Sequence, residues 1–326
     1  MKLFVYEHVT GGGMLAESPP ASLVREADLM LRTLVDELRA LPGVALATSR
    51  DPRLPPLDGI ETLVPAPGEP PPVLYARGLA DCEAAWPTAP ETGGVLEELA
   101  RRTLAAGVRL IGCRPEGVQV AASKRRTAQV LAARGIAVIP TFTATDSLPE
   151  TPGALWVVKP DDGAGADGLQ LVPGWRLAAA RLAADPGRLV AQPWLGGEAA
   201  SLSVQCRDGR ATLLAVNRQR VKVSPDGVTL VGLEVNALPD PGGRLAALAA
   251  EVCRAIPGLD GYVGIDLLLG DDAPVVVEVN PRLTTSYVAL GRSLGINVAR
   301  RLLDGPDAAP AGAGRPVSLV LEAADD

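Results

Sequence analysis

The sequence has 326 residues and contains few of the side chains on which many catalytic and metal sites depend. Histidine occurs once, at His8, and the four cysteines are scattered, at Cys82, Cys113, Cys206 and Cys253. No CxxC pair exists, which argues strongly against a zinc site built from Cys and His. Nucleophilic catalysis by a Cys–His pair or a Ser–His–Asp triad would have to use His8. We therefore interpret the cysteines as small buried apolar side chains in a reducing compartment.

Long apolar runs are also missing. No segment approaches the ~20 apolar residues of a membrane-spanning helix, and the N-terminal sequence MKLFVYEHVTGGG lacks the apolar stretch of a signal peptide. The formal charge of −7 disfavours general binding to nucleic acid or to an anionic membrane surface, although it leaves room for a local basic cleft. We therefore expect a cytoplasmic protein that binds small molecules, with no nucleic-acid or membrane partner. A homodimer is left open.

Lysine is scarce in a chain that otherwise has many basic residues. Of the 31 Lys and Arg residues, only Lys2, Lys124, Lys159 and Lys222 are lysines. The sequence otherwise prefers Arg, Ala, Gly and Pro, which we interpret as a compositional bias. The few positions that keep lysine against this bias are therefore more informative than lysines usually are.

What is present favours a globular protein of two or three domains, at about 100–200 residues per domain. The apolar content of 47% and the charged content of 21% are ordinary, and a chain of this length needs no disulfides to stabilise its core. Up to residue 112 the strand and helix patterns alternate, which predicts a parallel α/β unit. In this part we expect strands at 2–6, 44–48 and 108–112, helices at 22–41 and 93–106, and an irregular proline-rich connection at 50–72.

Beyond residue 123 the pattern changes to two α+β units dominated by antiparallel strands, with no internal repeat. The expected helices are at 124–134, 175–184, 243–255 and 288–303. The expected strands are at 156–159, 168–172, 189–192, 202–206, 212–216, 229–235, 262–269, 274–280 and 317–322, the last after a linker at 304–316.

A glycine motif lies between two of these strands. Residues 163–168, GAGADG, match GxGxxG, the dinucleotide-binding fingerprint. That fingerprint needs a helix that begins inside the motif, but residues 168–172 read as another strand. A Walker A loop is absent as well. We therefore interpret the motif as the turn of a hairpin that can lie over a ligand. A surface turn without function is the alternative, which the neighbouring Lys159 weakens.

The most informative segment is a hairpin that carries carboxylates. In a strand, residues two apart share a face, so Val276, Glu278 and Asn280 are expected on one side. If Leu269 pairs with Val275 across a turn at 270–274, then Asp266 lies opposite Glu278, with the two Cβ atoms ~5 Å apart.

Two adjacent carboxylates and an amide oxygen suit Mg²⁺, particularly when nucleotide phosphates complete its octahedron. An exposed acidic face is the alternative, but Asp266 and Glu278 stand within nearly continuous apolar strands, where an unpaired charge is costly. Arg282 follows as a cation suited to phosphate. We therefore favour the metal interpretation.

A lysine–glycine hairpin followed by a linker and then by D…ExN(P)R resembles the ATP-grasp superfamily of carboxylate–amine ligases. The resemblance covers about residues 120–303. It implies an α/β N-terminal domain (pre-ATP-grasp) and an α+β ATP-grasp fold whose two subdomains grip ATP between them. The implied boundaries are 1–120 for the N-terminal domain, 121–195 for the central lid subdomain and 196–326 for the C-terminal subdomain with the Mg²⁺-binding hairpin. The implied cofactors are ATP and Mg²⁺, with two ions expected and Mn²⁺ as a substitute.

The same resemblance implies a set of site residues. Lys124 and Lys159 look like phosphate-contacting lysines, and residues 163–168 look like the loop that closes over the triphosphate. Residues 190–195 look like the segment that grips adenine through backbone groups, although the family often has Glu where Gln192 stands. The implied ATP-binding residues are Lys124, Lys159, Gly163, Gly165, Gly168, Gln192, Pro193, Trp194, Leu195 and Glu198, the last as the acid that binds ribose.

The remaining implied residues carry the metal and the chemistry. Asp266, Glu278 and Asn280 look like the Mg²⁺ ligands. Arg282, together with Lys159, looks catalytic, and Arg282 would steady the transferred phosphoryl group and the acyl phosphate.

A narrower resemblance rests on four short segments. They are YEHVTGGG at 6–13, APET at 89–92, NRQ at 217–219 and NPRLTTSY at 280–287. Together they resemble the tyramine–glutamate ligase family of methanofuran synthesis, which joins the γ-carboxylate of glutamate to the amine of tyramine. The related coenzyme methylofuran uses tyrosine or tyramine in the same place. The implied substrates are therefore glutamate and an amine, joined through an acyl phosphate with release of ADP and phosphate.

This chemistry fits the scarcity of nucleophiles. ATP converts a poorly electrophilic carboxylate into an acyl phosphate, and the amine then displaces phosphate. The protein mainly positions the reactants and neutralises charge, so no catalytic Cys or His is needed. A glycine hairpin that closes over the site would keep water from hydrolysing the acyl phosphate.

Most candidate substrate residues have two interpretations. Glu7 and Glu91 are candidates to meet the amine or are surface acids, and Gly11 and Gly12 let the backbone approach substrate or form a turn. A basic strand face at 218–222 binds phosphate or carboxylate, or is a solvated edge. The remaining candidates on this strand and after Arg282 are Arg218, Arg220, Lys222, Thr284, Thr285 and Ser286.

Three alternatives stay open at this point. The first is another amino-acid or peptide ligase with the same fold. The second is a nucleotide-binding sensor without turnover, although the complete set Asp266, Glu278 and Asn280 with Arg282 argues against it. A dehydrogenase is more distant, because no helix is expected after the glycine motif.

Overall fold

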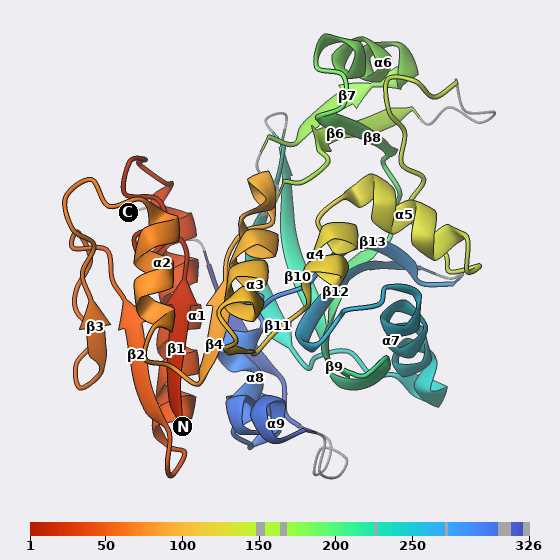
Figure 1. Cartoon of the computed structure of the whole chain (residues 1–326). Helices are drawn as coiled ribbons and strands as arrows, with labels where there is room; N and C mark the ends of the chain where they lie inside the picture. The colour runs from red at the N-terminus through yellow and green to blue at the C-terminus, as the bar shows by residue number, and fades with distance from the viewer. Residues whose placement is uncertain (148–153, 164–167, 225–226, 271–272, 306–313, 322–326) are drawn as a thin grey trace.

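The computed structural model describes residues 1–147, 154–163, 168–224, 227–270, 273–305 and 314–321. In this part of the chain the strands form a five-stranded, a three-stranded and a six-stranded sheet (Figure 1). Each sheet takes its strands from one of the ranges 1–120, 121–195 and 196–326, which we keep as proposed domain boundaries. Within the described ranges, no helix combines the length and the apolar character that crossing a bilayer requires.

The N-terminal sheet is parallel, as the alternating pattern predicts, with the strand order β3-β2-β1-β4-β5. Its strands are β1 (Lys2–Glu7), β2 (Ala45–Ser49), β3 (Glu61–Leu63), β4 (Ala84–Thr88) and β5 (Arg109–Leu110). The helices that cover it are α1 (Ala21–Arg39), α2 (Pro71–Leu79) and α3 (Val95–Ala105), with the 3₁₀ turn η1 (Thr92–Gly94) before α3.

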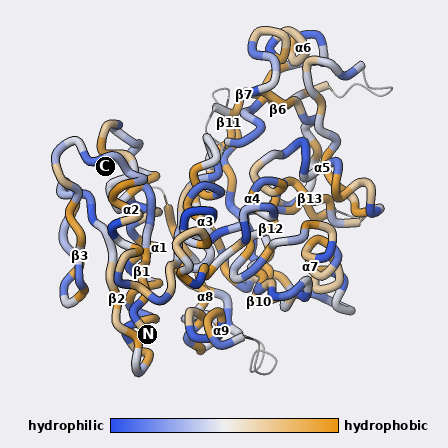
Figure 2. Tube along the Cα trace, in the orientation of Figure 1, coloured by the Kyte–Doolittle hydropathy of each residue, from blue (hydrophilic) through white to orange (hydrophobic). Residues whose placement is uncertain are grey.

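The side chains of β1 alternate between two apolar clusters. Phe4 and Tyr6 pack in one cluster with Tyr75 of α2, whereas Leu3 and Val5 pack in the other with the inner face of α1. A strand that is covered on both faces by helices needs such a nearly continuous apolar sequence. Figure 2 shows that α3 carries both hydrophobic and hydrophilic residues, as expected of a helix with one face against a sheet.

The strand order creates a switch point in this sheet. From β1 the chain builds β2 and β3 on one side, and it then adds β4 and β5 on the other. Open α/β sheets bind ligands outside the carboxyl ends of the strands at such a point. Glu7 ends β1, Thr88 ends β4 and Glu91 follows three residues later, so these residues lie at this edge of the sheet.

The three-stranded sheet confirms the predicted hairpin. Strands β6 (Leu155–Pro160) and β7 (Gln170–Pro173) flank the glycine motif and pair antiparallel, and β8 (Leu189–Pro193) pairs with the other edge of β6. Gly168 leads into β7 and not into a helix, which fits a hairpin and not a dinucleotide fold. Helix α6 (Gly174–Ala184) covers this sheet over a core of its own around Trp156. The unit stands apart at the top of Figure 1.

The six-stranded sheet is antiparallel, in the order β13-β12-β9-β10-β11-β14. Its strands are β9 (Glu198–Arg207), β10 (Arg210–Ser224), β11 (Gly227–Val235), β12 (Gly261–Leu269), β13 (Val275–Asn280) and β14 (Val317–Val320). The other helical elements are α4 (Pro115–Ala121), α5 (Lys124–Ala132), η2 (Pro241–Gly243), α7 (Arg244–Ala255), α8 (Tyr287–Leu294) and α9 (Val298–Asp304).

The expected helix at 288–303 is wrong, because the chain forms two helices there. Gly295 takes a left-handed conformation, with φ at +69°, and ends α8. Asn297 then caps α9, accepting a hydrogen bond from the Arg300 backbone N–H.

Two further expectations need correction. The region 50–72 is not wholly irregular, since it contains β3 and the start of α2. In the carboxylate hairpin, Asp266 does pair with Glu278, but Leu268 and not Leu269 pairs with Val275 because the register shifts between Asp266 and Leu267.

The shift also breaks the predicted alternation along β13. Val276, which was expected to share a face with Glu278, is fully buried in the same apolar cluster as Val279. An irregular register of this kind places an extra residue in one strand, so strict alternation cannot hold across it.

The N-terminal unit is joined to the C-terminal helices through Glu37 of α1. Its carboxylate accepts hydrogen bonds from the Tyr287 hydroxyl and, at 2.8 Å, from the Ala299 backbone N–H at the start of α9. The Asn297 amide donates to the Glu37 carbonyl at 2.6 Å. The five-stranded and six-stranded sheets therefore share packed helices, whereas the three-stranded sheet does not share in this core.

Glu37→Ala is expected to lower the free energy of unfolding by about 2–4 kcal/mol, since a buried hydroxyl and a helix N-terminus lose a carboxylate partner. The nearby Asp36→Ala is the matched control. Asp36 is exposed and makes only a 4.0 Å ion pair with Arg39, so its loss is expected to change stability by less than about 0.5 kcal/mol. Denaturant unfolding measures both; equal effects would contradict this role for Glu37.

Candidate functional site

Polar side chains from all three sheets converge where the sheets meet. Strands β12 and β13 supply Asp266, Glu278 and Asn280, and the segment after β13 supplies Arg282. Hydrogen bonds and ion pairs connect this group to the start of α5, to the end of β6 and to the segment after β4. The predicted metal and phosphate residues therefore lie together.

Asp266 and Glu278 face each other as paired residues of β12 and β13. Asp266 Oδ2 accepts a hydrogen bond from the Asn280 amide at 3.0 Å, and Oδ1 accepts one from the Gln219 amide at 2.9 Å. Burial, and then the Glu278 charge, raise the pKa of Asp266 well above its usual range. Burial also acts to raise the pKa of Glu278, but Lys124 and other nearby cations outweigh it and hold that pKa below its usual range.

The sequence did not point to Gln219 as a contact of this pair. It lies on β10, two strands away from β12 in the sheet order. The signal available was the NRQ segment at 217–219, which contributed to the narrower resemblance without a role for Gln219. Its amide orients one carboxylate of the candidate metal site, as neighbours of metal ligands commonly do.

The two predicted phosphate lysines are buried beside Glu278. Lys124 Nζ lies 3.6 Å from Glu278 Oε2 and donates a hydrogen bond to the Gly163 carbonyl. Lys159 lies on β6, and burial lowers its pKa although the Glu278 charge acts in the opposite direction. The glycine motif thus begins within reach of the carboxylate pair.

Asp161 explains why the two lysines come together. Its carboxylate accepts hydrogen bonds from the Ser123 hydroxyl at 2.6 Å and from the Arg125 backbone N–H at 2.8 Å. Ser123 caps α5 and accepts from the Arg126 backbone N–H at 3.1 Å. The start of α5, with Lys124, is therefore fixed to the end of β6, with Lys159, by a residue that the sequence reasoning did not single out.

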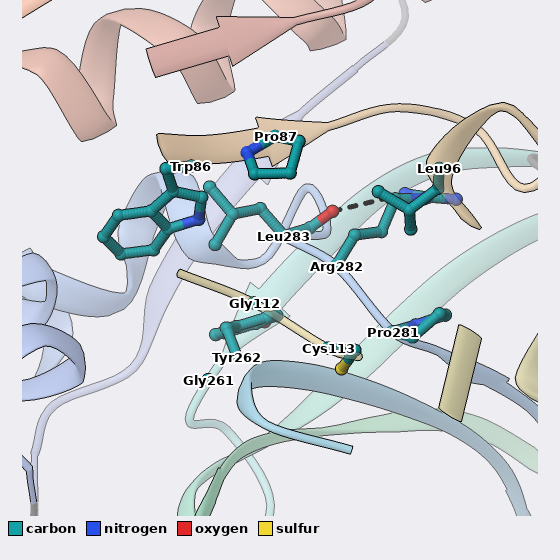
Figure 3. Close-up of a pocket in the computed structure, with 10 residues that line it drawn as sticks. All are labelled: Trp86, Pro87, Leu96, Gly112, Cys113, Gly261, Tyr262, Pro281, Arg282 and Leu283. Carbon is teal, nitrogen blue, oxygen red and sulfur yellow. Dashed lines mark hydrogen bonds between the residues drawn. The ribbon is translucent and has the colours of Figure 1, made fainter. Parts of the chain in front are cut away.

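Arg282 is largely buried and is held at several points. Its Nε lies 3.0 Å from Glu91 Oε1, and one terminal nitrogen donates to Glu91 Oε2 at 3.0 Å. The other terminal nitrogen donates to the Leu283 carbonyl at 3.2 Å (Figure 3). The small cavity in Figure 3, between Trp86 of β4 and Tyr262 of β12, has a volume of about 10 Å³, which is room for about one water. It is too small for a substrate.

Glu7 lies near Arg282 at the end of β1. Its Oε2 accepts hydrogen bonds from the Thr10 N–H at 2.6 Å and from the Thr10 hydroxyl at 2.7 Å, and its Oε1 accepts from the Val9 N–H at 3.2 Å. Burial raises the pKa of Glu7, and its turn contacts and Arg282 only partly offset this.

The glycines that follow are required by packing. A Cβ on Gly11 would lie 2.4 Å from the Glu7 carbonyl oxygen, and one on Gly12 would lie 2.7 Å from Pro65. Gly12 also has φ at +101°, a conformation that side chains disfavour. A close backbone approach to substrate at these positions stays a prediction.

The predicted adenine segment continues from β8. Gln192 is buried and donates to the Thr141 hydroxyl at 2.9 Å, and the Trp194 N–H donates to the Leu155 carbonyl at 2.9 Å. The Trp194 side chain is exposed, while Pro193 and Leu195 are partly buried. Their contact with a base stays a prediction.

The glycine motif is only partly described. Gly163 and Gly168 are placed, whereas Gly165 lies outside the described residues. Gly168 has φ at +68°, and a Cβ there would lie 3.2 Å from Pro160.

The basic strand face is partly neutralised. Arg218 makes ion pairs with Glu198 and, at 2.8 Å, with Glu234, and Arg220 also pairs with Glu234. Glu198 is therefore bonded to Arg218, and its predicted contact with ribose stays a prediction. Lys222 is exposed near the end of β10.

The hydroxyls after Arg282 contact protein groups. Thr285 donates to Glu26 at 2.8 Å. Thr284 and Ser286 each lie 2.9 Å from the Tyr262 hydroxyl and 2.9 Å from each other. Ser286 is buried, so these contacts order the segment that carries Arg282. Their contact with a substrate carboxylate stays a prediction.

The donor set fits a magnesium ion that also binds phosphate. Within the described ranges, no three His, Cys, Asp or Glu side chains gather into a complete metal cluster. Asp266, Glu278 and Asn280 supply oxygen donors, and burial first, with the Glu278 charge second, raises the pKa of Asp266. Mg²⁺ prefers oxygen ligands and takes one or two carboxylates together with substrate phosphates, so these residues suit it.

Two family profiles match this chain. A profile described as an ATP-grasp domain matches residues 121–286, and one described as a pre-ATP-grasp 3 domain matches residues 44–118. Together they cover the carboxylate hairpin, both lysines and most of the N-terminal sheet.

Curated relatives carry a more specific name. A tyramine–L-glutamate ligase from Methanocaldococcus jannaschii is 28% identical over 204 residues, which are 62% of this chain and 56% of that protein. A protein of the same name from Methanocaldococcus fervens is 35% identical over 100 residues, 30% of this chain and 32% of that protein. The matched part thus spans about half or less of each relative.

Solved structures share the fold. A protein assigned to the ATP-grasp superfamily from Archaeoglobus fulgidus has a TM-score of 0.73 at 20% identity, over 99% of this chain and 100% of the other. An L-amino acid ligase from Bacillus licheniformis has a TM-score of 0.64 at 17% identity, over 93% and 73% of the two chains. A D-alanine–D-alanine ligase from Bacillus anthracis also has a TM-score of 0.64, at 16% identity, over 93% and 95%. At these identities the likeness concerns the fold alone.

Proposed function

Because the chain belongs to the ATP-grasp family, we propose that it is an ATP-dependent ligase that forms an amide through an acyl phosphate. The proposed reaction joins the γ-carboxylate of glutamate to the amine of tyramine or tyrosine, with release of ADP and phosphate. One observation carries the proposal. A paired carboxylate site, Asp266 with Glu278, lies in the same cluster as two buried lysines and Arg282.

Each part of this cluster has a role suited to phosphoryl transfer. Asp266, Glu278 and Asn280 would hold Mg²⁺, which supplies charge neutralisation on the phosphates. Lys124 and Lys159 place compact positive charge beside the glycine motif, where a triphosphate would lie. Arg282 lies close enough to Glu278 and Asp266 to interact with their charges, and its planar guanidinium would suit the planar, charge-rich phosphoryl transition state.

In the proposed first step, a glutamate carboxylate oxygen attacks the γ-phosphorus of ATP. The bond from that phosphorus to the bridging oxygen breaks, and ADP leaves. In the second step the amine nitrogen attacks the acyl carbon, phosphate leaves and the nitrogen loses a proton. The protein contributes orientation and charge stabilisation in both steps, so it needs no covalent nucleophile.

The substrates are proposed to bind at the carboxyl ends of β1 and β4. This edge is the switch point of the parallel sheet. Glu91 at this edge forms an ion pair with Arg282, and Glu7 lies close enough to Arg282 to interact with its charge. The choice of tyramine and glutamate as substrates is supported by the name of the curated relatives, whose identity to this chain is modest. Another amino-acid or peptide ligase is the second candidate, because the alignment with the Methanocaldococcus jannaschii protein covers only 56% of that protein.

The experiment incubates the full chain with ATP, Mg²⁺, glutamate and a panel of amines, and follows ADP, phosphate and amide. Product formation that depends strictly on tyramine or tyrosine is the expected result. Turnover with other amines would support the second candidate. Release of AMP, or ADP release that is independent of both substrates, would contradict the proposed mechanism.

Gln219→Ala is expected to weaken the apparent affinity for Mg²⁺ by about 10-fold, since a group that orients a metal ligand is lost. Gln219 touches Asp266 and is not itself expected to contact the metal, so kcat at saturating Mg²⁺ is expected to change little. Initial rates over a Mg²⁺ series at fixed ATP measure this. Gln129→Ala on α5 is the control; an unchanged Mg²⁺ dependence in Gln219→Ala would show that the contact has no such role.

A further inference from the structure

Glu91 stands in an unusual place for a residue of the N-terminal sheet. It follows β4, yet both of its carboxylate oxygens face nitrogens of Arg282, which lies 191 residues further along the chain. Both side chains are largely buried, with exposed fractions of 6% for Glu91 and 14% for Arg282. One of the two contacts, from the terminal nitrogen to Oε2, is a hydrogen bond, and the contact of Nε with Oε1 is a close ion pair without hydrogen-bond geometry. Together with the hydrogen bond to the Leu283 carbonyl, they hold the guanidinium in one direction.

The same segment also touches the glycine hairpin. The Thr92 hydroxyl donates to the Asp162 carbonyl at 3.1 Å, and the Gly93 N–H donates to the Asp162 carboxylate at 2.9 Å. Asp162 directly precedes Gly163, whose carbonyl accepts from Lys124. Residues 91–93 therefore contact the arginine on one side and the nucleotide-binding hairpin on the other.

This geometry bears on the role predicted for Glu91. A carboxylate that bound the amine substrate would have to direct its oxygens toward that amine. Here Oε1 and Oε2 each face a different nitrogen of Arg282. The arrangement is better suited to orienting the guanidinium than to receiving a second cation.

We propose that Glu91 is a positioning residue that aims Arg282, and that Asp162 holds the segment 91–93 so that this aim depends on the hairpin. The inference rests on the proposed function, in which Arg282 contacts the transferred phosphoryl group. If Asp162 lost its contacts with Thr92 and Gly93, Glu91 would hold Arg282 less firmly. Phosphoryl transfer would thereby depend on the position of Asp162, which follows β6.

Glu91→Gln tests the first part. A neutral amide keeps the shape but not the charge, so kcat is expected to fall by about 10- to 100-fold, with KM for ATP and for the amine within about threefold of the starting values. Glu91→Asp is expected to recover part of the loss. Glu69→Gln is the matched control, because Glu69 also binds one arginine, Arg77, through both oxygens in the same unit.

A double-mutant cycle separates positioning from a structural effect. If Glu91 acts through Arg282, then Glu91→Gln costs little further activity in an Arg282→Lys background, where no planar guanidinium is left to aim. Single-turnover measurements at high enzyme concentration give these rates. Full additivity in the cycle, an unchanged kcat in Glu91→Gln, or a selective rise in the amine KM would each overturn the proposal.

Asp162→Ala tests the coupling to the hairpin. This substitution is expected to lower kcat by no more than Glu91→Gln does, because it acts through Glu91. The double variant is therefore expected to have the same kcat as Glu91→Gln alone. Independent, additive losses would overturn this part. The starting protein provides the check on the proposed function. If it shows no glutamate-dependent release of ADP, the ligase proposal fails. If it releases ADP normally and Glu91→Gln leaves kcat unchanged, only the positioning role is overturned.

Discussion

Glu278→Gln is expected to lower kcat on the order of 1000-fold, because it removes a charge that the site uses to hold Mg²⁺ against the phosphates. The carboxylate faces Lys124 and pairs across the hairpin with Asp266. A glutamine has nearly the same volume and can keep the strand pairing, so the fold is expected to survive. ADP and phosphate release at saturating ATP measure the loss, and thermal unfolding checks the fold.

Glu61→Gln is the matched control for this variant. Glu61 lies on strand β3 and pairs with Lys2 at 2.8 Å, so it is also a strand carboxylate bound to a lysine. It lies on the edge strand of the N-terminal sheet, whereas Glu278 lies in the six-stranded sheet. A similar kcat in Glu278→Gln and Glu61→Gln would refute the magnesium assignment.

Arg282→Lys has the second largest expected effect, a fall in kcat of about 100-fold. Lysine keeps the positive charge but cannot make the two-point contact with Glu91, so the charge is no longer aimed. KM for ATP is expected to change less than kcat, since Lys124 and Lys159 remain to bind phosphates. Steady-state rates over an ATP series measure both constants.

Arg301→Lys is a suitable control, because Arg301 contacts Gln205 at 2.9 Å in the C-terminal unit away from the carboxylate pair. If Arg282→Lys keeps its kcat within about threefold of the starting value, the proposed role of the guanidinium in phosphoryl transfer is wrong.

The local features of the site were predictable from the sequence. The sequence placed Asp266 opposite Glu278 correctly, although its turn register was off by one residue and the register shift beside Asp266 compensates for that. The strand after Gly168 was enough to reject a dinucleotide fold. Both inferences depend on neighbours within one hairpin, where geometry is set by a few residues. The register shift beside Asp266 was not predictable, because no glycine or proline stands there to mark it.

Contacts between distant segments could not be read from the sequence. The pair of Glu91 with Arg282 joins residues 191 positions apart, and Gln219 reaches Asp266 from another strand. Nothing in local propensity encodes such pairings, since they depend on how whole sheets meet. The sequence therefore left Glu91 open between a residue that meets the amine and a surface acid, and gave no sign of its contact with the arginine.

Strand β4 and helix α2 are among the elements that the sequence patterns did not predict, and each has a local reason. Strand β4 reads Ala-Ala-Trp-Pro-Thr, with few β-branched residues, and its Pro87 is tolerated because β5 pairs only with Ala84 and Ala85. Helix α2 begins in a run of prolines, which marks a loop as readily as a helix start. In both cases burial in the tertiary structure outweighs a weak local pattern.

The central claim is that a carboxylate is activated as an acyl phosphate. Glutamate labelled with ¹⁸O in its γ-carboxylate tests it directly, because in that mechanism one carboxylate oxygen leaves with the phosphate. The predicted result is that, in the presence of the amine, the released inorganic phosphate carries ¹⁸O in proportion to the amide formed. Unlabelled phosphate during amide formation, or label recovered in AMP, would contradict the account.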